Sequence, residues 1–215
     1  MGQYYKFMVG KKWDYPVGIS SYVYDNGAKL MEHSYVGNRY VDAAIRLMKY
    51  MEKESGEPNR VVWMGDYGDE VLPDIISDNK NDGVKCKFLY ASYVKAWMYD
   101  GGEFIPALDT DELPNLDYEH LTHSKGGIVC NMDTKEYVRV PPDTGEWPWS
   151  IHPLPLLTSV GNGCGGGDYC GTCMDAIGIW AGDHVTWISD EDAEVFIDNN
   201  NLKYLDDIVF KEERE

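Results

Sequence analysis

The chain has 215 residues, of which 43% are hydrophobic and 13% aromatic, so it can bury a substantial core and is unlike a disordered chain. Its 37 acidic and 19 basic residues give a formal net charge of −18, which disfavours direct binding to nucleic-acid phosphates. The sequence lacks a run of about 18 apolar residues and a secretion signal at its start. We therefore expect a cytoplasmic protein without membrane contacts.

The first element predicted in chain order is a β-hairpin over residues 19–33. In "SYVYDNGAKLMEHS", the dipeptide Asn26-Gly27 separates two strand-like runs. Asn-Gly can supply the two positive φ angles of a tight type I′ turn.

A long amphipathic helix is predicted next, over about residues 38–55. Asn38 can cap its first turn, and Gly56 stands where a left-handed residue ends a helix. Apolar side chains recur at steps of three and four residues. They are Val41, Ala44, Ile45, Met48 and Met51.

The middle of the chain is predicted to be less regular. "RVVWM" is a short buried strand, and residues 66–83 and 100–119 are surface loops on either side of a strand and helix over 84–99. "GGIVCNMDTKEYVRV" predicts a second hairpin that turns at Met132 to Lys135. The proline-rich segment that follows, "PPDTGEWPWSIHPLPLL", is assigned to a loop or a sheet edge.

Three further elements are predicted near the end of the chain. "AIGIW" and "HVTWI" read as short strands, and Ser189 with Asp192 opens a short helix at "EDAEVFIDN". The tail over residues 211–215 is expected to fray. The whole chain, residues 1–215, is therefore predicted to be a single α+β domain. Its sheet is mixed or antiparallel with hairpins, and one or two shorter helices accompany the long one.

The segment "GNGCGGGDYCGTC", residues 161–173, is the main candidate for a binding site. Consecutive glycines let several backbone N–H groups point into one concavity, which can hold an anion. The alternative is a tightly bent or mobile surface loop. The predicted ligand-binding residues are Gly163, Gly165, Gly166, Gly167, Asp168, His152, Asp66 and Asp183.

Two of these residues are predicted to be neighbours because "VVWMGDY" and "GIWAGDH" share one pattern. If both were parallel strands side by side, Asp66 and Asp183 would emerge at the same edge of the sheet. A pair of carboxylates near His152 could bind a divalent metal or share a proton. The alternative is that each Gly-Asp pair only forms a turn.

The cysteines raise the question of a zinc site. Cys164, Cys170 and Cys173 have a C-x5-C-x2-C spacing, and a fourth ligand is available from Cys130, His152 or His184. The alternative is free thiols and no cofactor. The odd total of five cysteines is typical of a reducing compartment and not of a disulfide framework.

Several motifs in combination resemble a family of uncharacterised bacterial and bacteriophage proteins. They are "MGQYYK", "GAKLMEHSYVGN", "RVVWMGDY", "KEYV" and "IHPLPLLTSVGNGCGGGDY". The resemblance extends over nearly the whole chain and implies a prokaryotic or phage setting. It attaches no activity, so it assigns no catalytic residue.

Three functional hypotheses follow from the sequence. In the first, the glycine-rich loop binds a small phosphate-bearing, nucleotide-like ligand. In the second, an acidic interaction factor binds a basic protein partner, as a phage inhibitor of a host defence protein would. In the third, the chain is a metal-dependent phosphoester hydrolase, because "GDYGD" fits the Gly-Asp-x-x-Asp element of metallophosphoesterases. The sequence leaves catalysis and oligomeric state open.

Overall fold

The computed structural model describes residues 2–10, 17–24, 26–67, 125–145 and 149–205. The predicted loops over 66–83 and 100–119 lie almost wholly outside these residues, as do the elements over 84–99 and the tail over 211–215. The described residues form a mixed sheet of eight strands with helices packed on it. This confirms the predicted α+β class.

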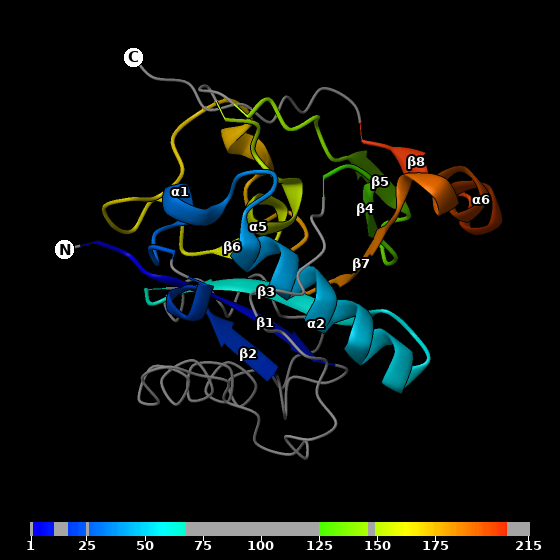
Figure 1. Cartoon of the computed structure of the whole chain (residues 1–215), viewed down its shortest axis with the longest axis horizontal. Helices are drawn as coiled ribbons and strands as arrows, with labels where there is room; N and C mark the ends of the chain where they lie inside the picture. Colours follow the sequence, from blue (N-terminus) through cyan, green and yellow to red (C-terminus); the bar gives the residue numbers. More distant parts are fainter. Residues whose placement is uncertain (1, 11–16, 25, 68–124, 146–148, 206–215) are drawn as a thin grey trace.

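The strands of the sheet come from all the described parts of the chain, from the first residues to the last (Figure 1). Its order is β2 (Val17–Ser20), β1 (Tyr5–Gly10), β3 (Asn59–Gly65), β7 (His184–Ile188), β4 (Ile128–Asn131), β5 (Glu136–Arg139) and β8 (Lys203–Tyr204). A further strand, β6 (Ser159–Val160), pairs in parallel with the last part of β3, whereas β7 pairs antiparallel with its first part. One edge of β3 is therefore shared between two strands.

The described helices are short except for α2. The α-helices are α1 (Leu30–His33), α2 (Arg39–Ser55), α5 (Pro153–Leu157) and α6 (Asp190–Asn200), and the 3-10 helices are η1 (Ser21–Tyr24) and η5 (Met174–Ala176). In Figure 1, α6 and β8 lie together at one end of the molecule, and α1 lies near the opposite end. None of the helices in these ranges is long and apolar enough to cross a membrane.

Helix α2 begins and ends where the sequence places it. The Asn38 side chain accepts a hydrogen bond from the Tyr40 backbone N–H at 2.8 Å, which caps the first turn. Gly56 has a left-handed φ of 75° and ends the helix. The helix packs against β1, β3 and β7.

An aromatic cluster fills the space between α2 and the sheet. The Trp63 ring centroid lies 5.2 Å from that of Phe7 and 5.1 Å from that of Tyr40. Trp63 Nε1 donates a hydrogen bond to His33 Nε2 at 2.8 Å, and His33 Nδ1 lies 3.0 Å from the Gly27 carbonyl oxygen. All four side chains are fully buried. His33 is thus a structural residue of the core.

The hairpin predicted over residues 126–140 is confirmed. β4 and β5 pair antiparallel from Ile128 with Arg139 to Asn131 with Glu136. The strand predicted at "HVTWI" is β7, and the helix after it is α6, whose Ser189 cap accepts from the Asp192 N–H. In each of these segments the apolar pattern predicts the observed element, and a turn or a helix cap marks where it begins or ends.

The hairpin predicted over residues 19–33 is wrong. Neither Asn26 nor Gly27 has a positive φ, so the type I′ turn does not form. β2 instead pairs antiparallel with β1, and Leu30 to His33 form α1. The Lys29 N–H that begins this helix donates to the Glu32 carboxylate, a local capping bond that replaces strand pairing.

The strand predicted at "AIGIW" is also wrong. This segment forms turns whose backbone is hydrogen-bonded to α5. The N–H groups of Gly178 and Trp180 donate to the carbonyls of Leu156 and Leu157, both at 2.8 Å. The prediction of a loop or a sheet edge for the proline-rich segment is wrong over residues 153–157, because Pro153 opens helix α5, where its missing N–H costs nothing. All five side chains of α5 are buried.

Candidate functional site

Backbone N–H groups of the glycine-rich loop bind a carboxylate of the same chain, the Asp168 side chain. The Asp168 carboxylate is buried, and its Oδ2 accepts hydrogen bonds from the N–H groups of Gly163 at 2.7 Å and Gly165 at 3.0 Å. Gly163 has a φ of 91°, which favours glycine. The Asp168 carboxylate therefore takes up the N–H groups of Gly163 and Gly165, which the glycine-rich pattern predicts to bind an external anion.

The other Asp168 oxygen fastens the loop to the first strand. Tyr5 Oη donates to Asp168 Oδ1 at 3.1 Å, and burial together with this carboxylate raises the pKa of Tyr5. The charge of Asp66 adds a smaller contribution that also raises the Tyr5 pKa. Asp66 Oδ1 accepts from the Tyr4 N–H at 3.0 Å. Asp66 thus binds the residue before β1, and Asp168 binds the first residue of β1.

Two residues that pack against the glycine-rich loop, Gln3 and Lys29, belong to no motif that would identify them from the sequence. Gln3 is fully buried between Gly65 and Gly165, and neither its Nε2 nor its Oε1 has a hydrogen-bond partner. The aliphatic chain of Lys29 lies against Gly167 and Gly2. A methyl group at Gly165 would lie 2.8 Å from Gln3 Cβ, so the close packing of the loop requires glycine there.

We predict that Asp168→Asn lowers the free energy of unfolding by about 2 kcal/mol, because a neutral amide cannot accept from all three donors. Urea unfolding followed by circular dichroism measures this loss. Asp175→Asn is the matched control, since Asp175 is exposed and loses the same charge. An equal effect of the two changes would contradict the fastening role of Asp168.

His152 is fully buried and does not border an open hollow. Its Nδ1 accepts from the Leu154 N–H at 3.1 Å, so the side chain caps α5. Its Nε2 is buried without a hydrogen-bond partner. Burial lowers the pKa of His152 to about 3, so the imidazole is neutral at physiological pH.

Asp66 and Asp183 are not neighbours, contrary to the sequence prediction. Asp66 follows the last residue of β3, whereas the Asp183 carbonyl accepts from Val61 N–H near the first residues of that strand. The residues before Asp183 form a turn, and β7 after it runs antiparallel to β3. Asp183 Oδ2 accepts from Asn131 Nδ2 at 2.7 Å, which joins it to β4.

The predicted zinc ligands do not form a cluster. No disulfide joins the described cysteines, and Cys164 and Cys170 are exposed. Among the proposed fourth ligands, Cys130 is buried in β4, and His184 Nδ1 lies 2.9 Å from Asp133 Oδ1. Within the described ranges, no group of three or more His, Cys, Asp or Glu side chains is arranged to hold a metal ion.

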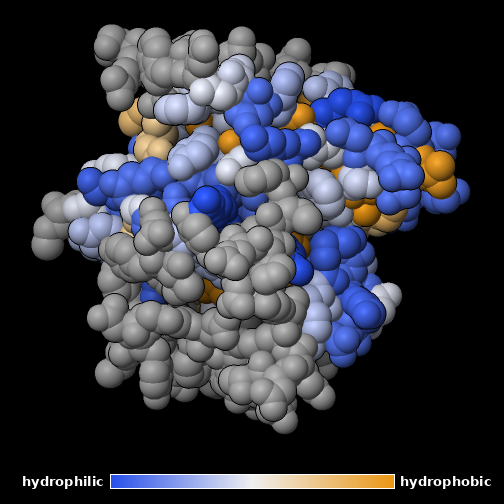
Figure 2. Space-filling model, viewed as in Figure 1, coloured by the Kyte–Doolittle hydropathy of each residue, from blue (hydrophilic) through white to orange (hydrophobic). Residues whose placement is uncertain are grey.

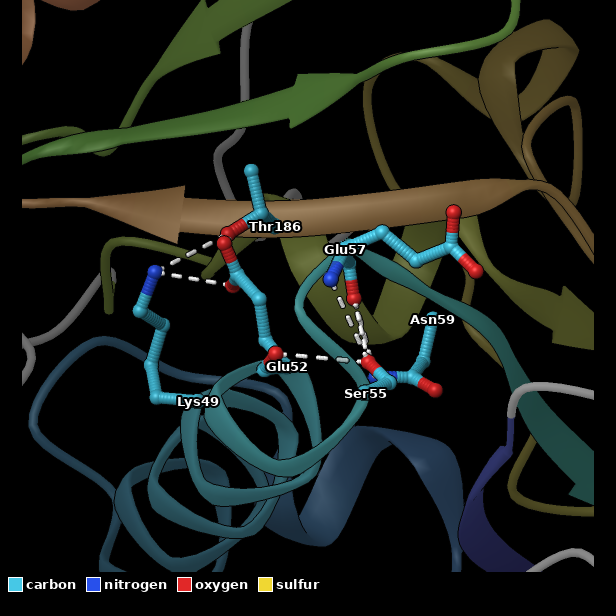
Figure 3. Close-up of polar contacts among 6 residues, drawn as sticks. All are labelled: Lys49, Glu52, Ser55, Glu57, Asn59 and Thr186. Carbon is cyan, nitrogen blue, oxygen red and sulfur yellow. Dashed lines mark hydrogen bonds and ion pairs between the residues drawn. The ribbon is translucent and has the colours of Figure 1, made fainter.

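A polar cluster joins the end of α2 to β7 and β3 (Figure 3). Lys49 Nζ lies 2.8 Å from Glu52 Oε2 and 3.3 Å from Thr186 Oγ1, and Thr186 Oγ1 donates to the same Glu52 oxygen at 2.7 Å. Ser55 Oγ accepts from Asn59 Nδ2 at 3.2 Å. Because Thr186 is fully buried, its hydroxyl fixes the helix to the strand and is not available as a nucleophile.

The surface around α6 has features that the glycine-rich loop lacks. Helix α6 contains no Lys or Arg, and its acidic side chains are all exposed: Asp190, Glu191, Asp192, Glu194 and Asp198. It packs on the sheet through Ala193, Phe196 and Ile197, while Val195 is 64% exposed. Figure 2 shows apolar surface among hydrophilic surface at the end of the molecule that carries α6.

A groove of about 310 Å³ lies beside this helix. It is lined by Lys49 of α2, by Trp187, Ile188 and Ser189 at the end of β7, and by Asp192 and Phe196 of α6. We name α6 and this groove together the α6 surface. It combines aromatic and aliphatic walls with exposed carboxylates. The sequence identified α6 as a helix but gave no sign that its acidic face borders a groove.

Comparison with known proteins adds no relative. No family model, curated protein or solved structure matches the chain. The resemblance to uncharacterised bacterial and bacteriophage proteins therefore depends on the sequence motifs alone.

Proposed function

We propose that the protein is an acidic interaction factor that binds a basic protein partner through the α6 surface. The observation that carries this proposal is the composition of α6. The helix exposes its acidic side chains and contains no Lys or Arg, although Arg139 of β5 pairs with Glu194, and Val195 of the same helix is exposed. An exposed apolar residue on a helix whose own charges are all acidic is suited to a partner of opposite charge that also offers apolar contacts.

The charge of the whole chain favours the same kind of partner. A net charge of −18 attracts basic proteins over a distance and repels nucleic acid. A basic, nucleic-acid-binding host defence protein is one partner of this kind, and the resemblance to bacteriophage proteins suggests it. The acidic surface would then occupy the site that normally binds phosphates.

The other two hypotheses draw less support from the geometry. A phosphate-bearing ligand at the glycine-rich loop would need the N–H groups of Gly163 and Gly165, which donate to Asp168. A carboxylate already in that position repels a second anion. Metal-dependent hydrolysis needs a group of ligands that the described residues do not assemble.

Peptide binding tests the proposal. The probe is a fluorescent amphipathic peptide whose charged residues are all arginine, and the comparison peptide has glutamate in their place. Fluorescence anisotropy at low salt should detect binding of the arginine peptide only. The double variant Glu191→Gln with Asp198→Asn should weaken this binding about fivefold, because each exposed charge contributes about 0.5 kcal/mol.

The matched control is the double variant Glu54→Gln with Asp175→Asn, which changes the net charge equally on other exposed segments. It should leave the affinity within about twofold of the unaltered protein. Equal weakening by the two double variants would mean that the peptide binds the acidic surface diffusely. That result, or no binding at all, would refute the α6 surface as the docking site.

A further inference from the structure

We infer that the groove of the α6 surface receives one arginine side chain of the basic partner. This inference rests on the proposed function and adds the residue that anchors the partner. It follows from the walls of the groove, its charge and its size.

The walls of the groove are aromatic and fixed in place. Trp187 Nε1 donates to the Gly126 carbonyl oxygen at 3.1 Å, which fixes the indole ring. Phe196 packs against the apolar cluster beneath α6 and is only partly buried. A guanidinium group is planar and weakly hydrated, so it stacks on aromatic rings more readily than an ammonium group does.

The charge available in the groove is negative. The Lys49 ammonium is held between Glu52 Oε2 and Thr186 Oγ1, so its charge is compensated on the α2 side. Asp192 is exposed, and its Oδ2 accepts only a hydroxyl hydrogen bond, from Ser189 at 3.0 Å. No basic side chain in the described ranges pairs with Asp192. Its carboxylate can therefore accept two parallel N–H bonds from a guanidinium.

The size of the groove limits the occupant to one side chain. A volume of about 310 Å³ is at the lower end of the range for ligand pockets, which begins near 300 Å³. One extended arginine fits such a space between two rings and a carboxylate. A whole helix or strand of the partner would instead lie across α6, with its arginine directed into the groove.

Two-dimensional NMR of the labelled protein tests this inference with Nα-acetylarginine amide as the probe. The indole N–H signal of Trp187, identified by its absence in Trp187→Phe, should shift as the probe is added. Nα-acetylcitrulline amide has nearly the same shape without the charge and should cause no shift. Asp192→Asn should raise the dissociation constant of the arginine probe about tenfold.

Asp175→Asn is the matched control, because it removes the same charge from an exposed position outside the α6 surface. It should change the dissociation constant less than twofold or so. Phe196→Leu keeps an apolar side chain, so α6 should remain folded by circular dichroism while the arginine probe binds more weakly. Equal shifts with arginine and citrulline, or equal effects of the two aspartate changes, would overturn the inference. If the arginine peptide still binds in that case, the proposed function stands without this anchor.

Discussion

Replacing Trp63 by alanine is expected to lower the free energy of unfolding by about 4 kcal/mol, the largest effect of any single change considered for this protein. Trp63 is fully buried against Phe7 and Tyr40, and its indole N–H is bonded to His33. The change leaves a cavity and removes the hydrogen-bond donor of a buried imidazole. Urea unfolding followed by far-ultraviolet circular dichroism measures the loss.

Two further variants separate the causes of this loss. Trp63→Phe keeps an aromatic ring but removes the indole N–H, so it should cost about 2 kcal/mol. Trp149→Ala is the control for the removal of a tryptophan from the surface, because Trp149 is 42% exposed. It should cost less than about 1 kcal/mol. If Trp63→Ala were no more destabilising than Trp149→Ala, the aromatic cluster would not be the centre of the core.

The second large effect is a loss of stability in mild acid, caused by two buried neutral histidines. Burial lowers the pKa of His33 to about 4 and that of His152 to about 3, from an ordinary 6.5. Well above pH 6.5 both histidines are neutral whether the chain is folded or unfolded, so they do not alter stability. As the pH falls below 6.5, only the unfolded chain takes up these protons, and the folded state becomes relatively less stable.

The expected loss approaches about 1.4 kcal/mol per pH unit for each histidine once the pH is well below 6.5, and it amounts to about 3 kcal/mol for both between pH 6.5 and 5. Urea midpoints measured at a series of pH values check this. The carboxylates of this acidic chain also titrate at low pH, so a variant is needed to isolate the histidine effect. His152→Asn can still cap α5 but cannot take up a proton. It should remove about half of the loss, and an unchanged pH dependence would contradict the assignment.

The elements that could be predicted from the sequence are those with local signals that agree. Helix α2 has a cap at Asn38, a repeating apolar pattern and a terminating Gly56, and each of these features determines structure within a few residues. The hairpin formed by β4 and β5 and the start of α6 at Ser189 are of the same kind. Tertiary packing does not need to override any local preference in these segments.

The elements that could not be predicted depend on contacts between distant residues. Asn26-Gly27 is a strong hairpin signal, but β2 pairs with β1 and not with the residues after Gly27. Those residues form α1, and its Leu30 side chain is buried in the core. "AIGIW" has the composition of a strand, yet its N–H groups bond to α5, a helix formed by a proline-rich segment. Short apolar runs are compatible with several structures, and the partner that decides between them is remote in sequence.

The candidate site was predictable only in part, for the same reason. The glycine-rich pattern predicts backbone donors that face a ligand, but the N–H groups of Gly163 and Gly165 donate to Asp168, a contact that the pattern does not encode. The relation between Asp66 and Asp183 depended on strand direction, which no local pattern encodes. The groove beside α6 forms between Lys49 and residues from 187 onward, so it exists only in the folded chain.

The most direct test of the α6 surface is to map the bound arginine peptide by two-dimensional NMR of the labelled protein. The predicted result is that backbone amide signals shift mainly over residues 187–198 and around Lys49, which line or border the groove. These shifts should diminish as salt screens the charges. Shifts centred on the glycine-rich loop over 161–173, or spread evenly over exposed acidic segments, would contradict the α6 surface as the place where a partner binds.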